Sequence, residues 1–189
     1  IGRDMSYRLG WVRGVSAPLI GPEYCRLMAR YNTWQNRSLY TAAAGLSEAD
    51  RQADRGAFWH SMQGTLSHLM WGDLPWLRRF AGGPGAQGSG KASDRAYDWA
   101  ALLAERPDLA ARIMAWAEAV PGEDLTGDLT WYSGFLGRDV SKPKGPCVIQ
   151  FFNHQTHHRG QVHAMLTAAG ARPDDTDLPF MPEDLPPWP

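Results

Sequence analysis

Cysteine is scarce in this chain, which has only Cys25 and Cys147 among its 189 residues. The two residues lie far apart and form no CxxC pair, so the sequence excludes a disulfide framework. Neither residue has a cluster of cationic neighbours that would favour its thiolate form. We therefore expect two reduced, unpaired thiols in a cytoplasmic protein.

The chain also lacks an excess of charge of either sign and a long apolar run. Lysine and arginine total 19, aspartate and glutamate total 20, and the net charge is −1. Because the cationic residues are scattered, we expect no nucleic-acid partner and no basic surface for an anionic membrane. No stretch of about 18 apolar residues occurs, so no transmembrane helix is predicted.

The composition is that of one globular domain. Apolar residues make up 43% of the chain and charged residues 21%, and a chain of this length can bury a full hydrophobic core. The apolar residues of the N-terminal segment are too dispersed for a signal-peptide core. We expect residues 1–18 to be a disordered or loosely attached leader and residues 19–189 to form a single domain.

Four segments are predicted to be helices. The first begins at Pro22 and stops at Gly45, since proline suits a first helical turn and glycine suits a helix end. The other three span about residues 56–80, 97–120 and 146–169. Pro75 is expected to kink the second helix or end it early, and Pro107 disfavours the first half of the third.

The connections are predicted to be loops with one extended stretch. Residues 81–91 are rich in glycine, and residues 137–146 and the proline-rich tail from Arg172 are expected to be irregular. Residues 125–135 favour a short extended piece. Four helices with short to medium connections predict an all-α fold, a four-helix bundle, in which side chains of facing helices can hold a metal ion.

Histidines are concentrated in the last predicted helix, in the segment FFNHQTHHRGQVH. At about 100° per residue, His154 and His158 fall on the apolar side of this helix, whereas His157 and His163 fall outside it. Two imidazoles one turn apart can ligate one metal ion, which would offset the cost of burying them. Two partly buried histidines hydrogen-bonded to neighbouring helices explain the spacing as well, because HxxxH is common by chance.

A third ligand would have to come from another helix, and His60 and His68 are the candidates. The apolar stripe of the second helix is centred about 140° away from His68, which gives little support for burial. A strip of small residues lies on the same side as His68: Ser61, Gly64, Thr65 and Gly72. This strip could admit a neighbouring helix or form one wall of a cleft. We expect His60 at the surface.

Four motifs together resemble the DinB/YfiT-like family. They are MARYNTWQNRSLY, GTLSHLMWGDLPWLRRF, NHQTHHRGQVHAML and AAGARPDDTDLPFM, and the resemblance covers about residues 22–182. It implies a bundle with an up-down-down-up course, usually a homodimer. It also implies that His68, His154 and His158 are the ligands of one divalent ion, with zinc or nickel favoured.

Other polar residues in these motifs could either support the ligand histidines or stabilise the fold elsewhere. Asp73 lies in an apolar stripe and needs a partner, for which Arg159 is one candidate, and a buried structural pair is favoured over a catalytic one. Asn36 and Gln161 could orient the ligand histidines or cap backbone groups. Two tryptophans are expected in the core, namely Trp34 and Trp76.

A metal held by three neutral histidines keeps positions open, which favours catalysis over a structural role. One hypothesis is a hydrolase that activates water. A second is an enzyme that transfers a low-molecular-weight thiol to an electrophilic small molecule, and the resemblance favours it because relatives include thiol-dependent S-transferases and a thiol-dependent isomerase. A third is a metal-binding or stress-related protein without catalysis.

Overall fold

The computed structural model describes residues 18–81, 97–134, 136–185 and 188–189. Within these ranges the chain is mostly helical, and two strands form a small sheet. The predicted helical character is therefore confirmed, with the sheet as an addition. The expected leader and the expected glycine-rich loop lie almost entirely outside the described residues.

Helix α1 (Pro22–Ala44) has the bounds that the sequence predicts. Pro22 occupies the first turn, and Gly45 follows the last helical residue. Trp34 lies in the buried face of this helix, as expected, whereas Trp76 is only half-buried.

Helix α3 (Met62–Ala81) begins later than predicted because the residues before it form a tight turn. Ala57 and His60 form an isolated bridge, and His60 has a φ of 62°, which a continuous helix does not allow. The hydroxyl of Ser61 accepts a backbone hydrogen bond in the first turn of α3. Pro75 lies inside the helix, so the early end that it predicted does not occur.

Helix α4 (Trp99–Ala119) continues through Pro107, so its first half forms although proline disfavours it. The carboxylate of Asp98 accepts a hydrogen bond of 2.7 Å from a backbone N–H of the first turn and caps the helix. Leu102 and Arg106, which precede the proline, are completely buried. Tertiary packing therefore stabilises the turns that local sequence disfavours.

Strands β1 (Asp128–Ser133) and β2 (Arg138–Pro143) form an antiparallel hairpin. The predicted extended stretch is confirmed by β1, but the predicted loop at residues 137–146 is wrong. The β2 sequence does not alternate apolar and polar residues, so it gives no strand signal. Val140 is the one buried residue of this strand. The segment is extended because it pairs with β1, with Val140 opposite Trp131.

Helix α5 (Lys144–Ala168) follows β2 directly and therefore begins slightly before the predicted residue 146. Gly170, just beyond its end, has a φ of 84°, a conformation that glycine adopts without strain. The tail beyond it is mostly irregular, as predicted. It runs along α1, where five side chains form hydrogen bonds with it: Arg30, Tyr31, Gln35, Arg37 and Ser38.

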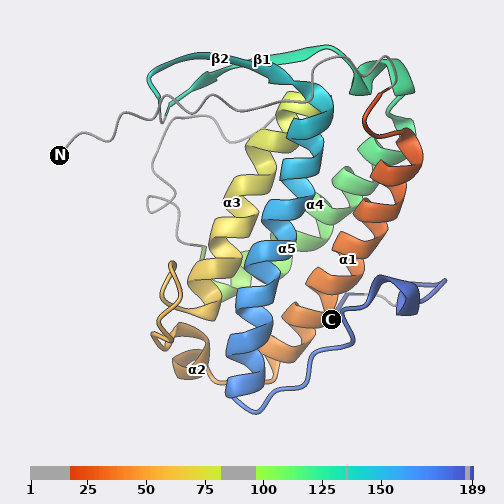
Figure 1. Ribbon diagram of the computed structural model, residues 1–189. Coiled ribbons are helices and arrows are strands. Elements are labelled where there is room, and N and C mark those ends of the chain that lie inside the picture. Colours follow the sequence, from red (N-terminus) through yellow and green to blue (C-terminus); the bar gives the residue numbers. More distant parts are fainter. Residues whose placement is uncertain (1–17, 82–96, 135, 186–187) are drawn as a thin grey trace.

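The four long helices pack around one apolar core (Figure 1). Helix α1 contacts α4 and α5, and α3 contacts the same two helices. Helices α1 and α5 run from the end that carries the hairpin toward the opposite end, and α3 and α4 run the other way (Figure 1). All four contribute large buried side chains, among them Leu39, Leu66, Leu69, Leu102, Ile113, Phe151 and Phe152.

Three shorter elements complete the described structure: helix α2 (Glu48–Gln52) and the 3-10 helices η2 (Gly122–Leu125) and η3 (Leu178–Phe180). Cys25 and Cys147 are buried and unpaired, as expected. Among the described residues, no helix has the length and apolar character that crossing a membrane requires.

Candidate metal centre

Three histidine side chains converge between α3 and α5. His68 extends from α3, and His154 and His158 lie one turn apart on α5. One ring nitrogen of each residue lies within 4.8 Å of the other two, and Nε2 of His68 is 2.9 Å from Nε2 of His154. The structure thus brings together the three residues that the family resemblance implies as ligands.

The close approach of the two helices depends on Gly72. A Cβ atom at this position would lie 3.2 Å from Cε1 of His154, tighter than side chains normally pack. In the turn before α3, the indole of Trp59 stacks on the imidazole of His68, with ring centroids 4.2 Å apart. The small residue therefore admits His154, and the turn before α3 places an aromatic ring against His68.

The electrostatic environment keeps the three imidazoles neutral at pH 7. Burial lowers the pKa of His68 to about 3 and that of His154 to about 4, and nearby histidines add to both shifts. Burial also lowers the pKa of His158, against the opposing effect of a hydrogen bond to Gln161. A neutral imidazole has a free nitrogen lone pair, which is the form that ligates metals.

Gln161 orients the ring of His158. Nδ1 of His158 donates a hydrogen bond of 2.7 Å to Oε1 of Gln161, because a carbonyl oxygen can only accept. The proton therefore resides on Nδ1, and Nε2 retains the lone pair available to a metal. This contact matches the supporting role that the sequence allows for Gln161.

Replacing Gln161 by leucine is expected to weaken zinc binding by about 10–100-fold, because hydrogen bonds that orient a ligand histidine contribute about this much. The Gln161→Glu variant retains an acceptor for the Nδ1 proton and should bind zinc at least as tightly as the wild type. Competition titrations against a chromophoric chelator measure both affinities. Equal affinity of the leucine variant and the wild type would contradict this role.

Asp73 pairs with Arg106 of α4, and not with Arg159. Nη1 of Arg106 donates to Oδ2 of Asp73 at 2.6 Å, and both side chains are 1% exposed. The partner Arg106 is not among the residues predicted from the sequence, although it shares a helical face with the buried Leu102 and Leu109. A charged residue within that apolar face is the signal that could have revealed the pair.

Two further predicted residues bind partners outside the histidine group. Arg159 donates hydrogen bonds to the side-chain oxygens of Asn32 and Thr156. The amide nitrogen of Asn36 also donates to Asn32. Of the predicted supporting residues, Gln161 is the one whose described hydrogen bonds reach a histidine of the group.

The remaining histidines lie outside the group. His60 is exposed, as predicted, and its Nδ1 lies 3.2 Å from Oδ2 of Asp54. His157 and His163 are on α5 but do not belong to the group. The helical-wheel separation of these two residues from His154 and His158 therefore agrees with the structure.

The donor set fits one divalent transition-metal ion. Within the described residues the group holds no cysteine and no carboxylate, so its donors are neutral imidazoles. Imidazole is a ligand that suits zinc and nickel. One ion would be held by His68, His154 and His158.

Three imidazoles that converge from two facing helices are a group that could hold one metal ion inside a helical bundle. Within this class, the chain belongs to the DinB family, whose sequence model matches residues 20–185. The match covers all four long helices and all three histidines of the group. No curated protein and no solved structure matches the chain.

Proposed function

We propose that this DinB family member is a metal-dependent enzyme that transfers a low-molecular-weight thiol to an electrophilic small molecule. The observation that carries the proposal is the group of three neutral imidazoles, to which the described residues add no fourth protein donor. Structural zinc sites usually have four protein ligands, whereas catalytic sites keep a position open. When bound, the ion supplies Lewis-acid chemistry that favours the thiolate form of a ligated thiol.

The residues around the histidines would bind the substrate. His68 and His154 are half-buried, so the group is not enclosed by the bundle. Trp59 stacks on His68, and Trp71 lies nearly parallel to the same ring with centroids 6.2 Å apart. Two indoles therefore flank His68 and offer an apolar surface to an electrophilic substrate.

Thiol transfer is favoured over hydrolysis because the described residues place no carboxylate base against the group. The exposed His157, whose ring centroid is 4.8 Å from that of His158, is the other imidazole beside it. In the transfer, sulfur forms a bond to an electrophilic carbon, the leaving group departs with the electron pair of its broken bond, and the thiol proton passes to the leaving group or to solvent. An ionised thiol needs no separate base for this step. Among the described contacts, no carboxylate is hydrogen-bonded to the three histidines, whereas a hydrolase has more need of such a base.

The proposal includes one zinc or nickel ion per chain, a homodimer and a cytoplasmic location. The three imidazole donors support either metal. The two unpaired cysteines support a reducing compartment. Family membership supports a homodimer with an up-down-down-up course, and the helix directions in Figure 1 support that course as well.

The test is a screen of low-molecular-weight thiols against electrophilic acceptors with zinc-loaded and nickel-loaded protein. Loss of free thiol should depend on metal and should disappear in the His154→Ala variant. The His163→Ala variant, altered on the opposite side of α5, should retain turnover. Metal-dependent ester hydrolysis without thiol transfer would favour a hydrolase, and metal binding without either activity would favour a non-catalytic protein.

A further inference from the structure

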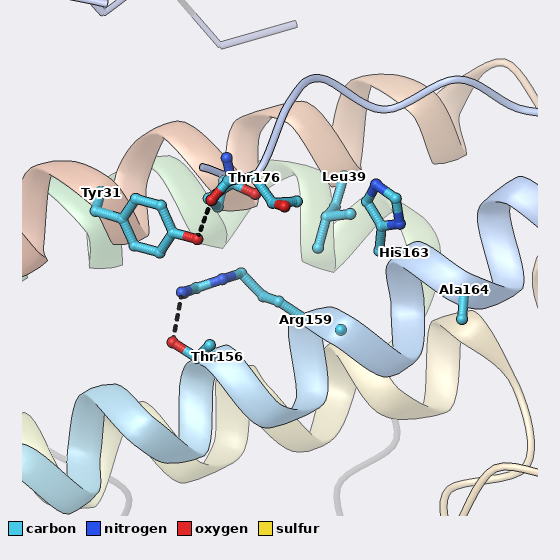
Figure 2. A pocket seen from close by; sticks show the side chains of 9 residues that line it. Tyr31, Leu39, Thr156, Arg159, His163, Ala164 and Thr176 are labelled. Carbon is cyan, nitrogen blue, oxygen red and sulfur yellow. Dashed lines mark hydrogen bonds between the residues drawn. The ribbon is translucent and has the colours of Figure 1, made fainter. Parts of the chain in front are cut away.

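A pocket lies on the opposite side of α5 from the three histidines. It has a volume of about 290 Å³ and lies between α1, α5 and the C-terminal tail, with Tyr31, Arg159 and Thr176 among its lining residues (Figure 2). At about 100° per residue, Arg159 is roughly 100° or more around the helix axis from both His154 and His158. The pocket is therefore separate from the candidate metal centre.

The tail is bound firmly enough to α1 to serve as one wall of this pocket. The hydroxyl of Tyr31 donates a hydrogen bond of 2.7 Å to the backbone oxygen of Thr176 (Figure 2). The side-chain amide of Gln35 donates one of 2.7 Å to the backbone oxygen of Asp175. Leu39, the next lining residue along α1, supplies an apolar surface.

Arg159 brings to this pocket a buried positive charge for which the described residues supply no ion-pair partner. The residue is 5% exposed, and its hydrogen bonds go to the neutral oxygens of Asn32 and Thr156. Its guanidinium also lies over the ring of Tyr31, 5.3 Å from the centroid, and this ring carries no negative charge. Among the described residues Asp73 is the one buried carboxylate, and it forms its ion pair with Arg106. Two buried guanidinium groups thus face at most one negative charge, so at least one positive charge is left over.

Nearby acids of the tail do not neutralise this charge. The carboxylate of Asp174 pairs with Arg37 at 3.1 Å, and that of Asp175 accepts a hydrogen bond from the backbone N–H of Asp177. No ion pair of the described residues includes Arg159. A guanidinium group is positively charged at pH 7. Because buried charges are normally paired, the charge of Arg159 is available to an anion from outside the chain.

Gly160 keeps the pocket open. It is exposed in the middle of α5, where glycine costs about 0.5–1 kcal/mol relative to alanine. A Cβ atom at this position would have no neighbour within 4 Å, so packing does not require a glycine there. Gly160 lines the pocket beside Arg159, and a larger side chain would project into the space that a ligand needs.

We propose that this pocket binds a small organic anion, with a carboxylate or phosphate group on Arg159 and an apolar part against Tyr31 and Leu39. A planar guanidinium matches either group through two parallel hydrogen bonds. The pocket volume is near the lower end of the roughly 300–1,000 Å³ that small-molecule sites occupy, which favours a compact ligand. The proposal does not depend on the metal centre or on thiol transfer.

The experiment measures binding of benzoate and of inorganic phosphate by calorimetry and by thermal shift, at constant ionic strength in chloride. Wild-type protein should bind at least one of them. Arg159→Met and Gly160→Leu should weaken that binding by about tenfold or more, because the first removes a charge-assisted contact and the second fills the pocket. Ala168→Leu, an exposed substitution on the same helix, should bind like the wild type.

The two probes separate the two ligand chemistries. Binding of benzoate alone would identify a carboxylate site, and binding of phosphate alone a phosphate site. The proposal is overturned if the wild type binds neither probe, or if Gly160→Leu binds as tightly as the wild type, since any anion is then held elsewhere. Metal content measured for each variant shows whether the histidine group is unaffected. If Arg159→Met does not fold, Gly160→Leu still decides the outcome, because replacing a mid-helix glycine does not disfavour the helix.

Discussion

Replacing His158 by alanine is expected to abolish tight metal binding. Wild-type protein purified without chelators or a histidine tag should carry about one zinc or nickel ion per chain. The variant loses one of three donors, so its affinity for zinc should fall by more than about 100-fold, beyond the roughly 10–100-fold caused by losing an orienting hydrogen bond. Elemental analysis gives the metal content, and chelator competition gives the affinity.

The matched control is His163→Ala, which removes an imidazole from the other side of the same helix and should leave metal binding unchanged. Added zinc should raise the melting temperature of the wild type and of this control but not that of His158→Ala, because a ligand that binds only the folded state stabilises it. Failure of the wild type to take up zinc or nickel would remove the basis of the proposed function.

Replacing Arg106 by methionine is expected to cause the largest loss of stability. The substitution leaves the carboxylate of Asp73 buried without its partner, and breaking a buried pair costs about 3–5 kcal/mol. A domain has a free energy of unfolding of about 5–15 kcal/mol, so this is a large fraction of the total. Urea denaturation of metal-free protein measures the change.

Two further variants separate the loss of pairing from the loss of packing. The double variant Asp73→Leu with Arg106→Met should recover most of the stability, because two apolar side chains leave no buried charge without a partner. Nε and Nη2 of Arg106 have no hydrogen-bond partner among the described residues, so their removal costs little. Arg112→Met alters a partly exposed pair on the same helix and should cost about 0–1 kcal/mol. If Arg106→Met cost no more than this control, the buried pair would not be the stabilising contact that we infer.

Local sequence predicted the elements whose signals are local. The bounds of α1 follow from Pro22 and Gly45, which act on the residues beside them. The inward direction of His154 and His158 follows from helix geometry, since about 100° per residue places both among apolar neighbours. Sequence did not predict β2, because only the facing strand makes that segment extended.

The site itself was only partly accessible to sequence reasoning. Helix geometry alone gave little support for His68, which lies away from the apolar stripe of its helix, and the family resemblance supplied it. The partner of Asp73 was missed because Arg106 is on another helix, and no local pattern pairs residues so far apart in the chain. The aromatic ring on His68 comes from Trp59, whose place depends on the positive φ of His60 in the preceding turn.

The sequence by itself determined that four long segments are helical, which side of α5 faces inward, and that the chain resembles a family with three histidine ligands. The tertiary structure decided that His68 meets His154 across Gly72, that Arg106 neutralises Asp73, and that Arg159 lies beside a pocket with no ion-pair partner among the described residues. The physical reason is one of range. Dihedral preferences and helical periodicity act over a few residues, whereas metal-donor geometry and charge balance depend on side chains that only packing brings together.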